Sequence, residues 1–215
     1  MADSLPQWRK EFLAFCLECE VLRFGDFTLK SGRKSPYFFN AGLFNTGAKL
    51  AKLGKYYSAA IAEAGISYSV IFGPAYKGIP LAAATAIALA QYYDTDKPYC
   101  YNRKEAKDHG EGGNIVGAPL EGRALVIDDV ITAGTAIRES VAIIEAHSAA
   151  LAGVVVALDR EECSTGSNIT AIQQVKEEFK VPVIAVATLS HLIAYLDSEG
   201  KTDQAERLRQ HKAAS

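Results

Sequence analysis

The chain has 215 residues, 49% of them hydrophobic and 22% charged, so it can bury one full core of the kind found in soluble globular proteins. Its net charge of −2 excludes the strong positive field that would attract a nucleic acid or an anionic membrane surface. Any anionic ligand must therefore be bound by locally placed Lys and Arg side chains. We expect one domain that acts on small molecules.

The N-terminal segment and the cysteines predict a cytoplasmic protein. MADSLPQWRKEFLAF lacks an apolar run of signal-peptide length, and no segment approaches the roughly 20 uninterrupted apolar residues of a membrane span. The four cysteines are too few and too scattered for a disulfide framework, which fits a reducing compartment. Cys16 and Cys19 form a C-x-x-C pattern, but both lie on the apolar face of an amphipathic segment, which favours packing over redox or metal chemistry.

The first 45 residues predict a helix and a pair of short strands. The helix spans about residues 7–22, and the segments FGDFTL and PYFFN read as strands because the turn-rich KSGRKS separates them. Two strands joined by so short a connection are antiparallel. This N-terminal pattern differs from that of the rest of the chain.

From residue 46, helices alternate with short, continuously apolar strands. We expect helices at 46–65, 77–91, 135–147 and 168–179, and strands at 68–73, 98–103, 124–128, 153–159 and 181–187. This alternation predicts an α/β fold with a central parallel sheet that helices cover on both faces. Sheets of this kind bind ligands beyond the carboxyl ends of their strands.

A long polar connection interrupts the alternation. Residues 104–123, KEAKDHGEGGNIVGAPLEGR, are rich in glycine and show neither a helical nor a strand period. Connections of this length are usually functional lids or disordered segments. Because the charges of this segment nearly cancel, its composition alone favours a solvated loop.

The stretch ALVIDDVITAGTAIRES, residues 124–140, combines an apolar strand, two adjacent acids and a turn of small residues. The strand delivers Asp128 and Asp129 to the edge of the sheet, and the amide groups of the turn that follows can bind a phosphate. Adjacent carboxylates repel each other unless ribose hydroxyls or a magnesium-bearing ligand uses them. Alternatively, Asp128 caps a turn and Asp129 faces solvent. P-loop and Rossmann proteins also bind phosphate at such turns, but the glycine signatures of both are missing.

Within this stretch, VIDDVITAGTA resembles the signature with which type I phosphoribosyltransferases bind 5-phospho-α-D-ribose 1-diphosphate (PRPP). In that family the acid pair holds the ribose diol and the next loop wraps the 5-phosphate. The resemblance implies the type I phosphoribosyltransferase fold in a single domain, residues 1–215, with a core at about 65–187 and a small hood from residues 1–45 and the C-terminal helices. It also implies Mg²⁺ carried mainly by PRPP, with no dedicated protein metal site.

Three further motifs resemble the orotate phosphoribosyltransferase family. They are F-T-L-K-S-G-R-x-S-P-Y-F-F-N at 27–40, G-P-A-Y-K-G-I-P at 73–80 and Y-N-R-K-E-x-K-D-H-G-E-G at 101–112. The likeness implies transfer of phosphoribose from PRPP to N1 of orotate, which gives orotidine 5′-monophosphate and diphosphate in pyrimidine biosynthesis. It makes the polar connection a catalytic lid that reaches into the other subunit of a homodimer, in place of the solvated loop that composition alone favours.

The motif match assigns roles residue by residue. The residues implied to be catalytic are Lys104, Lys107, His109, Asp128 and Asp129. The residues implied to bind PRPP are Lys30, Tyr76, Lys77, Arg103, Lys104, Lys107, His109, Asp128, Asp129, Val130, Ile131, Thr132, Ala133, Gly134, Thr135 and Ala136. The residues implied to bind orotate are Lys30, Phe38, Phe39, Thr132 and Arg160.

Several of these roles have plainer alternatives. Adjacent strand residues point to opposite faces, so we expect only one of Phe38 and Phe39 to cover the pyrimidine ring while the other packs inward. Arg160 suits an acidic base because a guanidinium grips a carboxylate with two hydrogen bonds, but it could instead form a surface ion pair with Glu161 or Glu162. Lys77 could be an ordinary exposed residue in the first turn of a helix.

Other functions compete with this interpretation. A purine or uracil phosphoribosyltransferase would keep the acid pair and the phosphate loop without the residues assigned to orotate. A PRPP-sensing regulator would need a nucleic-acid surface, which the net charge does not favour. His147, His191 and His211 lie outside every motif and are predicted to be structural or exposed.

Overall fold

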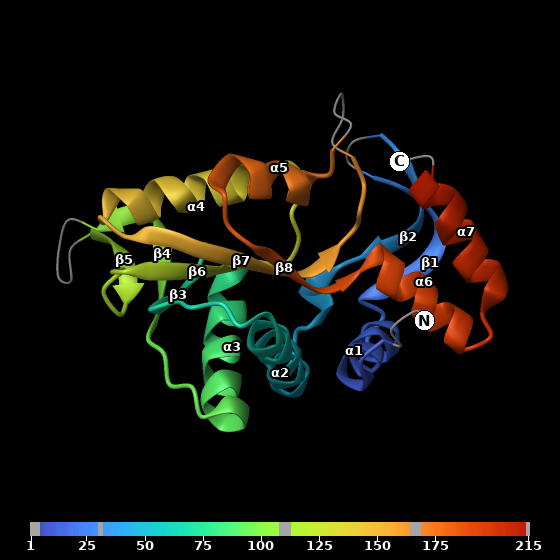
Figure 1. The fold of residues 1–215 in the computed structure, drawn as a ribbon, viewed down its shortest axis with the longest axis horizontal. Coiled ribbons are helices and arrows are strands. Elements are labelled where there is room, and N and C mark those ends of the chain that lie inside the picture. Colours follow the sequence, from blue (N-terminus) through green and yellow to red (C-terminus); the bar gives the residue numbers. More distant parts are fainter. Residues whose placement is uncertain (1–4, 30–31, 108–112, 164–168, 214–215) are drawn as a thin grey trace.

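A six-stranded sheet with helices on both faces forms the larger part of the molecule, and a two-stranded sheet lies beside it (Figure 1). The structure is a computed structural model that describes residues 5–29, 32–107, 113–163 and 169–213, with the backbone alone at 106, 107 and 113. In chain order the principal elements are α1 (Gln7–Glu18), β1 (Leu22–Thr28), β2 (Lys34–Phe39), α2 (Gly47–Ala64), β3 (Val70–Gly73), α3 (Gly78–Tyr93), β4 (Tyr99–Lys107), β5 (Gly113–Gly117), β6 (Arg123–Ile127), α4 (Thr135–Ala146), β7 (Ala150–Asp159), α5 (Ala171–Phe179), β8 (Val183–Thr188), α6 (Leu189–Ser198) and α7 (Thr202–Ala213).

The strand order of the large sheet creates a binding crevice. Its order is β5-β4-β3-β6-β7-β8, and all neighbours are parallel except the antiparallel pair β4 and β5. The expected α/β fold with a central, mostly parallel sheet is confirmed. From β3 the chain passes to β4 on one side of the sheet and later returns to β6 on the other. The crevice for a ligand therefore opens at the carboxyl ends of β3 and β6, where the direction of winding reverses.

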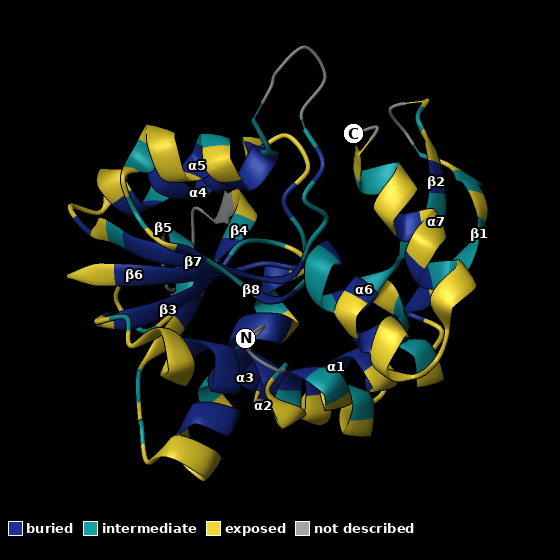
Figure 2. Ribbon diagram, turned by 45° about the vertical axis from the view of Figure 1, so that its right-hand side comes forward, coloured by how far each residue is buried: buried dark blue, intermediate teal, exposed yellow. Residues whose placement is uncertain are grey.

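The strands of the sheet are apolar throughout because both faces are buried. Leu125 and Ile127 of β6 point into one cluster, which also receives side chains of α1 and α2, whereas Val126 points into another beneath α4 and α5. All three side chains are fully buried. Figure 2 shows this as dark blue strands between helices whose outer faces are yellow. The rigid sheet thus fixes the position of whatever follows each strand.

The segment between β4 and β6 differs from the expectation. β4 continues to Lys107, and β5 returns antiparallel to it with Cys100 opposite Gly117, so residues 104–107 and 113–117 are not structureless. Backbone hydrogen bonds hold such an antiparallel pair at the edge of a sheet, so its side chains need no apolar period. The sequence pattern therefore missed the hairpin.

The small sheet consists of β1 and β2, paired antiparallel with Leu22 opposite Phe39. The first helix is shorter than predicted: α1 ends at Glu18, and Glu20 adopts a positive φ of 56° before β1 begins. α6 and α7 pack against each other, and α7 contacts β2. The C-terminal helices therefore lie beside the N-terminal strands, as Figures 1 and 2 show. The division into one domain with a separate hood stays a prediction.

The cysteines and the helices bear on two further expectations. All four cysteines are free thiols, and Cys16 is buried in the core, so its C-x-x-C pattern packs as expected. None of the described helices is both long and apolar enough to cross a membrane.

Candidate functional site

The expected site residues follow neighbouring strands of the sheet at one edge. Lys77 follows β3, the pair Asp128 and Asp129 follows β6, and Arg160 follows β7. Because β3, β6 and β7 are parallel, their carboxyl ends meet at the same edge. Lys104 lies near the carboxyl end of β4, which pairs parallel with β3, and its side chain is exposed.

The acid pair is buried and held by hydrogen bonds. Asp128 and Asp129 are each only 7% exposed, which excludes the alternative of a solvent-facing Asp129. The Asp129 amide donates to Asp128 Oδ1 at 2.9 Å, and the Val130 amide donates to Asp129 Oδ1 at 3.0 Å. Lys77 Nζ donates to Asp129 Oδ2 at 2.6 Å. Lys77 is exposed at the start of α3, as the alternative expected, with a side chain that is 67% exposed, but it also forms an ion pair with the acid pair.

Burial makes Asp128 an unusually weak acid. It raises the pKa of Asp128 to about 6, and the neighbouring charge of Asp129 acts in the same direction. The hydrogen bond from the Asp129 amide and the charge of Lys77 lower this pKa but do not compensate. A carboxylate in this state gains from any ligand that supplies hydroxyl protons or a cation.

Tyr57 supports the acid pair from beneath and was missed by the sequence analysis. Its hydroxyl group donates to the backbone carbonyl of Asp128 at 2.7 Å, and its side chain is fully buried in α2. Burial and the charges of Asp129 and Asp128 raise the pKa of Tyr57, so it stays a donor. In the sequence, only one feature could have indicated this role: Tyr57 lies on the inward face of a predicted helix, and a buried Tyr hydroxyl group needs a hydrogen-bond acceptor.

The turn between β3 and α3 is tight and is braced by β4. A Cβ atom on Gly73 would lie 2.4 Å from the carbonyl oxygen of Gly78, so the close approach requires glycine. Asn102 of β4 is buried, and its Oδ1 accepts a hydrogen bond from the Ala75 amide at 2.8 Å. The bond between Ala75 and Tyr76 is cis. The sequence analysis gave Asn102 no role.

The loop after the acid pair surrounds a hollow of about 310 Å³, to which Asp128, Thr132 and Thr135 contribute. Gly134 precedes α4 with a positive φ of 73°, and Arg138 Nη1 braces the loop by donating to the carbonyl of Ala133 at 2.9 Å. Among the described residues, the amides of 131–137 donate no hydrogen bond. Amides at the positive end of a helix dipole are suited to a phosphate.

The residues assigned to orotate lie on β2 and after β7. Phe38 packs against Phe27, with ring centroids 5.6 Å apart, whereas Phe39 packs on the core, so the two rings occupy opposite faces as expected. Arg160 Nη2 donates to Ser35 Oγ of β2 at 3.3 Å, which joins the two elements. Arg160 does pair with Glu162, but at a buried position and not on the surface.

The remaining predicted residues are described only in part. Lys30 and His109 lie outside the described residues, and only the backbone of Lys107 is described, at the end of β4. Arg103 is half-buried. Within the described ranges, no three His, Cys, Asp or Glu side chains gather as the ligands of a metal ion would.

Comparison with known proteins identifies the family. Residues 42–190 match the model of the phosphoribosyl transferase domain. The chain is 62% identical over 209 residues to an orotate phosphoribosyltransferase of Aliivibrio fischeri and 61% identical to one of Vibrio vulnificus, with 97% of both chains covered in each case. The chain belongs to the orotate phosphoribosyltransferase family. A crystal structure of the Francisella tularensis orotate phosphoribosyltransferase is 44% identical, with a TM-score of 0.87 over 95% of this chain and 98% of that one.

Membership of this family settles the class of protein. The fold is that of the type I phosphoribosyltransferases, as the motif at the acid pair implied. The protein is an enzyme of the glycosyltransferase kind. The edge that carries the acid pair and the loop hollow is its candidate active site.

The raised pKa of Asp128 predicts that this residue destabilises the fold at neutral pH. Above pH 6 the folded state carries a buried charge that the unfolded state leaves in water, and below about pH 4 both states are protonated. Asp128→Asn should therefore raise the free energy of unfolding by up to about 3 kcal/mol at pH 8, and this gain should shrink towards zero at pH 4. Urea unfolding at a series of pH values measures it.

Asp26→Asn is the matched control, because the Asp26 carboxylate is 92% exposed and its only ion pair within the described ranges is with Arg207 on the surface. It should change stability little at any pH. An effect of Asp128→Asn that is equally large at pH 8 and pH 4 would contradict the explanation by a buried charge.

Proposed function

We propose that the protein transfers phosphoribose from PRPP to N1 of orotate, forming orotidine 5′-monophosphate and diphosphate in pyrimidine biosynthesis. The observation that carries the proposal is the buried pair Asp128 and Asp129 beside a hollow lined by amide-rich turns. The names of relatives that are about 60% identical over nearly the whole chain support the choice of substrates. The four free thiols support the cytoplasm as its location.

The acid pair and the loop suit the two ends of phosphoribose. The carboxylates accept hydrogen bonds from the vicinal 2′ and 3′ hydroxyls, which relieves the repulsion between them. The 5-phosphate enters the hollow and accepts hydrogen bonds from the amides of the loop. Small side chains there allow the phosphate to approach the backbone. Residues 130–136 thereby bind PRPP, and Tyr76 and Lys77 face its diphosphate from the opposite wall of the crevice.

The base site explains why the acceptor is acidic. Arg160 supplies a guanidinium group for the carboxylate of orotate, and Thr132 offers an exposed hydroxyl group from the phosphate loop. Phe38 covers one face of the pyrimidine ring, and Phe39 holds the strand to the core. A purine or uracil would leave the Arg160 guanidinium without an anion, which argues against those acceptors.

Catalysis rests on position and charge. Cleavage of the C1–O bond leaves an oxocarbenium-like ribose and a diphosphate with several negative charges. Arg103, Lys104, Lys107 and His109 of the lid, with Lys30, would neutralise the developing charge and exclude water. The proposal needs no covalent nucleophile, because the site would hold the two substrates in line for direct transfer. A PRPP-sensing regulator would not need this set of cations.

The direct test follows orotate absorbance with purified protein, PRPP and Mg²⁺, with uracil, hypoxanthine or adenine offered in parallel. Orotate should be consumed only with PRPP, and Lys104→Ala should lower kcat about 100-fold, as the loss of one donor to a developing charge does. Glu105→Ala, an exposed neighbour on the same strand, should change kcat little. Consumption of another base instead of orotate would reject the acceptor, and PRPP binding without any reaction would favour the regulator.

We further propose that Mg²⁺ enters the site on PRPP. The donors present fit this role: the acid pair offers carboxylate oxygens, which Mg²⁺ prefers, but too few for a complete protein cage. Bound to the diphosphate, Mg²⁺ would neutralise charge on the leaving group. Addition of excess EDTA should abolish orotate consumption, and excess Mg²⁺ should restore it. Full activity in EDTA would contradict the proposal.

The homodimer with shared sites is also part of the proposal, because the lid segment of the family crosses to the other subunit. Lys104→Ala removes a lid cation and Asp129→Asn removes one charge of the acid pair, and each variant alone should keep about 1% of wild-type activity or less. In equal mixture after dissociation and reassociation, mixed dimers would contain one intact site, which predicts about a quarter of wild-type activity. No recovery in verified mixed dimers would show that each lid serves its own subunit.

A further inference from the structure

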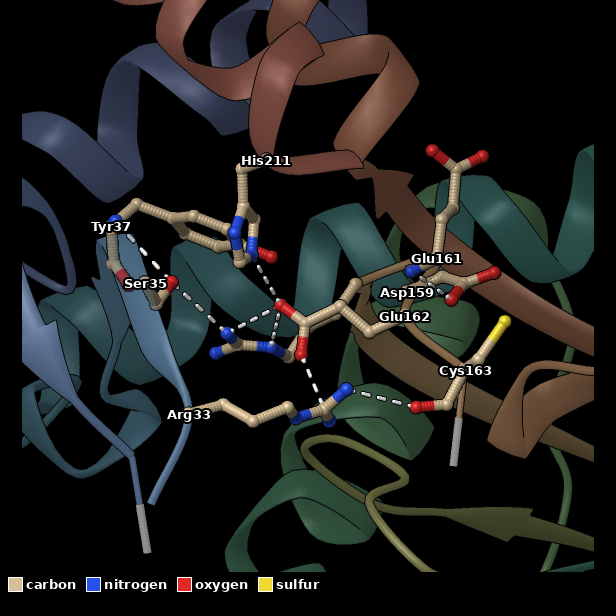
Figure 3. Close-up of polar contacts among 9 residues, drawn as sticks. Arg33, Ser35, Tyr37, Asp159, Glu161, Glu162, Cys163 and His211 are labelled. Atoms are coloured by element: carbon tan, nitrogen blue, oxygen red, sulfur yellow. Dashed lines mark hydrogen bonds and ion pairs between the residues drawn. The ribbon is translucent and has the colours of Figure 1, made fainter. Parts of the chain in front are cut away.

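A buried carboxylate, Glu162, lies among two arginines and a histidine close to the proposed base site (Figure 3). Its side chain is 6% exposed. Glu162 Oε1 accepts hydrogen bonds from Arg160 Nε at 3.1 Å and from Arg160 Nη2 at 2.7 Å, and it lies 3.1 Å from His211 Nε2. Oε2 of the same carboxylate accepts from Arg33 Nη2 at 3.4 Å. These contacts join the segment after β7 to the start of β2 and to the last turn of α7.

Glu162 stays ionised because of these partners. Burial alone would raise its pKa, but the hydrogen bonds and charges of Arg160 and His211 more than offset burial, so the pKa lies below its ordinary value. A fixed anion thus lies against one edge of the guanidinium group. Removing it would leave Arg160 with neither its charge partner nor its orientation.

The guanidinium group of Arg160 is held on three sides. Glu162 takes Nε and Nη2, and Ser35 Oγ accepts from Nη2 at 3.3 Å. The guanidinium carbon lies 4.7 Å from the centre of the Tyr37 ring, a cation–π contact. Within the described part of the chain, Arg160 Nη1 makes no hydrogen bond. It is also absent from the set of fully buried nitrogens that lack a partner, so a ligand can reach it. Nη1 is therefore the nitrogen left for a ligand.

His211 closes the arrangement from the C-terminal helix. Its side chain is 14% exposed, and its ring meets the fully buried ring of Tyr37 edge to face, with centroids 6.1 Å apart. It therefore touches both Glu162, which fixes the guanidinium group, and Tyr37, on which that group rests. Because no motif surrounds His211, the sequence alone offered no reason to connect it with Arg160.

We infer that Glu162 and His211 are positioning residues for the base site: they fix the Arg160 guanidinium on Tyr37 with Nη1 directed to the carboxylate of the acceptor base. The inference rests on the proposed function, because it assumes that Arg160 binds this carboxylate. An arginine held in its binding geometry loses little side-chain entropy when the ligand arrives. Within the described residues, the hydrogen bonds of Arg160 and Glu162 run to each other, to Ser35, to Arg33 and to His211, and not to the acid pair or the phosphate loop. The inference therefore expects PRPP binding to change little when this network is altered.

The test compares substitutions at two consecutive residues of α7. His211→Ala removes the contact with Glu162, and His211→Gln retains a side chain that can donate to it. Lys212→Met is the matched control, because Lys212 Nζ donates to Glu161 Oε2 at 2.8 Å and to Ser190 Oγ at 2.5 Å and so anchors the same turn without touching Arg160. KM for orotate, KM for PRPP, kcat and melting temperature are measured for each variant.

His211→Ala should raise KM for orotate about tenfold and leave KM for PRPP unchanged, as the loss of one hydrogen bond to a charged group predicts. His211→Gln should recover most of the orotate affinity, and Lys212→Met should keep both KM values even if its melting temperature falls. A rise of both KM values in His211→Ala and Lys212→Met alike would overturn the inference, because α7 would then act only as a structural anchor. An unchanged KM for orotate in His211→Ala would overturn it as well.

Glu162→Gln keeps the inference open to test if His211→Ala does not fold. It preserves the shape of the side chain and removes the charge, so it too should raise KM for orotate selectively. The wild-type and Arg160→Ala proteins distinguish failure of the proposed function from failure of the inference. A wild-type protein that consumes no orotate overturns both together. Orotate turnover that depends on Arg160 but not on Glu162 or His211 overturns the inference alone.

Discussion

The burial of negative charge at the carboxyl edge of the sheet is the constraint on which the rest of the site depends. A carboxylate taken out of water is costly unless hydrogen bonds and cations replace its hydration. The buried charge of Asp129 is offset by Lys77, which lies between β3 and α3, and by a hydrogen bond from the amide of Val130. Tyr57 fixes the backbone of Asp128 from α2. Two of the partners of this short segment thus come from separate elements, the turn between β3 and α3 and the helix α2, which ties the site to the arrangement of the fold.

Glu162 is also a buried carboxylate, but its partners compensate for the loss of water. Arg160, His211 and Arg33 surround it, and the pKa of Glu162 is lowered, whereas that of Asp128 is raised to about 6. Glu162 is thus satisfied within the chain and serves as a fixed support. The burial of Asp128 is only partly offset by its hydrogen bond from the Asp129 amide and by the charge of Lys77, so Asp128 favours a ligand. This contrast separates a carboxylate that orients another side chain from one that binds substrate.

Local patterns made much of the fold and part of the site predictable. The alternation of helices with apolar strands predicted the parallel sheet, because strands that are buried on both faces have continuously apolar sequences. The acid pair was visible because two adjacent acids at the end of such a strand are unusual. Asn102, Tyr57 and His211 were not visible, because their contacts join residues far apart in sequence. β5 was missed because backbone hydrogen bonds form it without an apolar pattern.

Electrostatics also explains why the proposed PRPP should arrive with a metal ion. The ligand is a polyanion, and the edge it approaches carries the carboxylates of Asp128 and Asp129 with a single described ion pair, that of Lys77, to offset them. Lys77 is largely exposed, so water weakens its compensation. Diphosphate without a cation would be repelled by these carboxylates, whereas Mg²⁺ on the diphosphate would be attracted to them. The charge of the acid pair would then select the metal-bound form of the proposed ligand, and the neutral ribose hydroxyls would donate hydrogen bonds to the buried carboxylate oxygens.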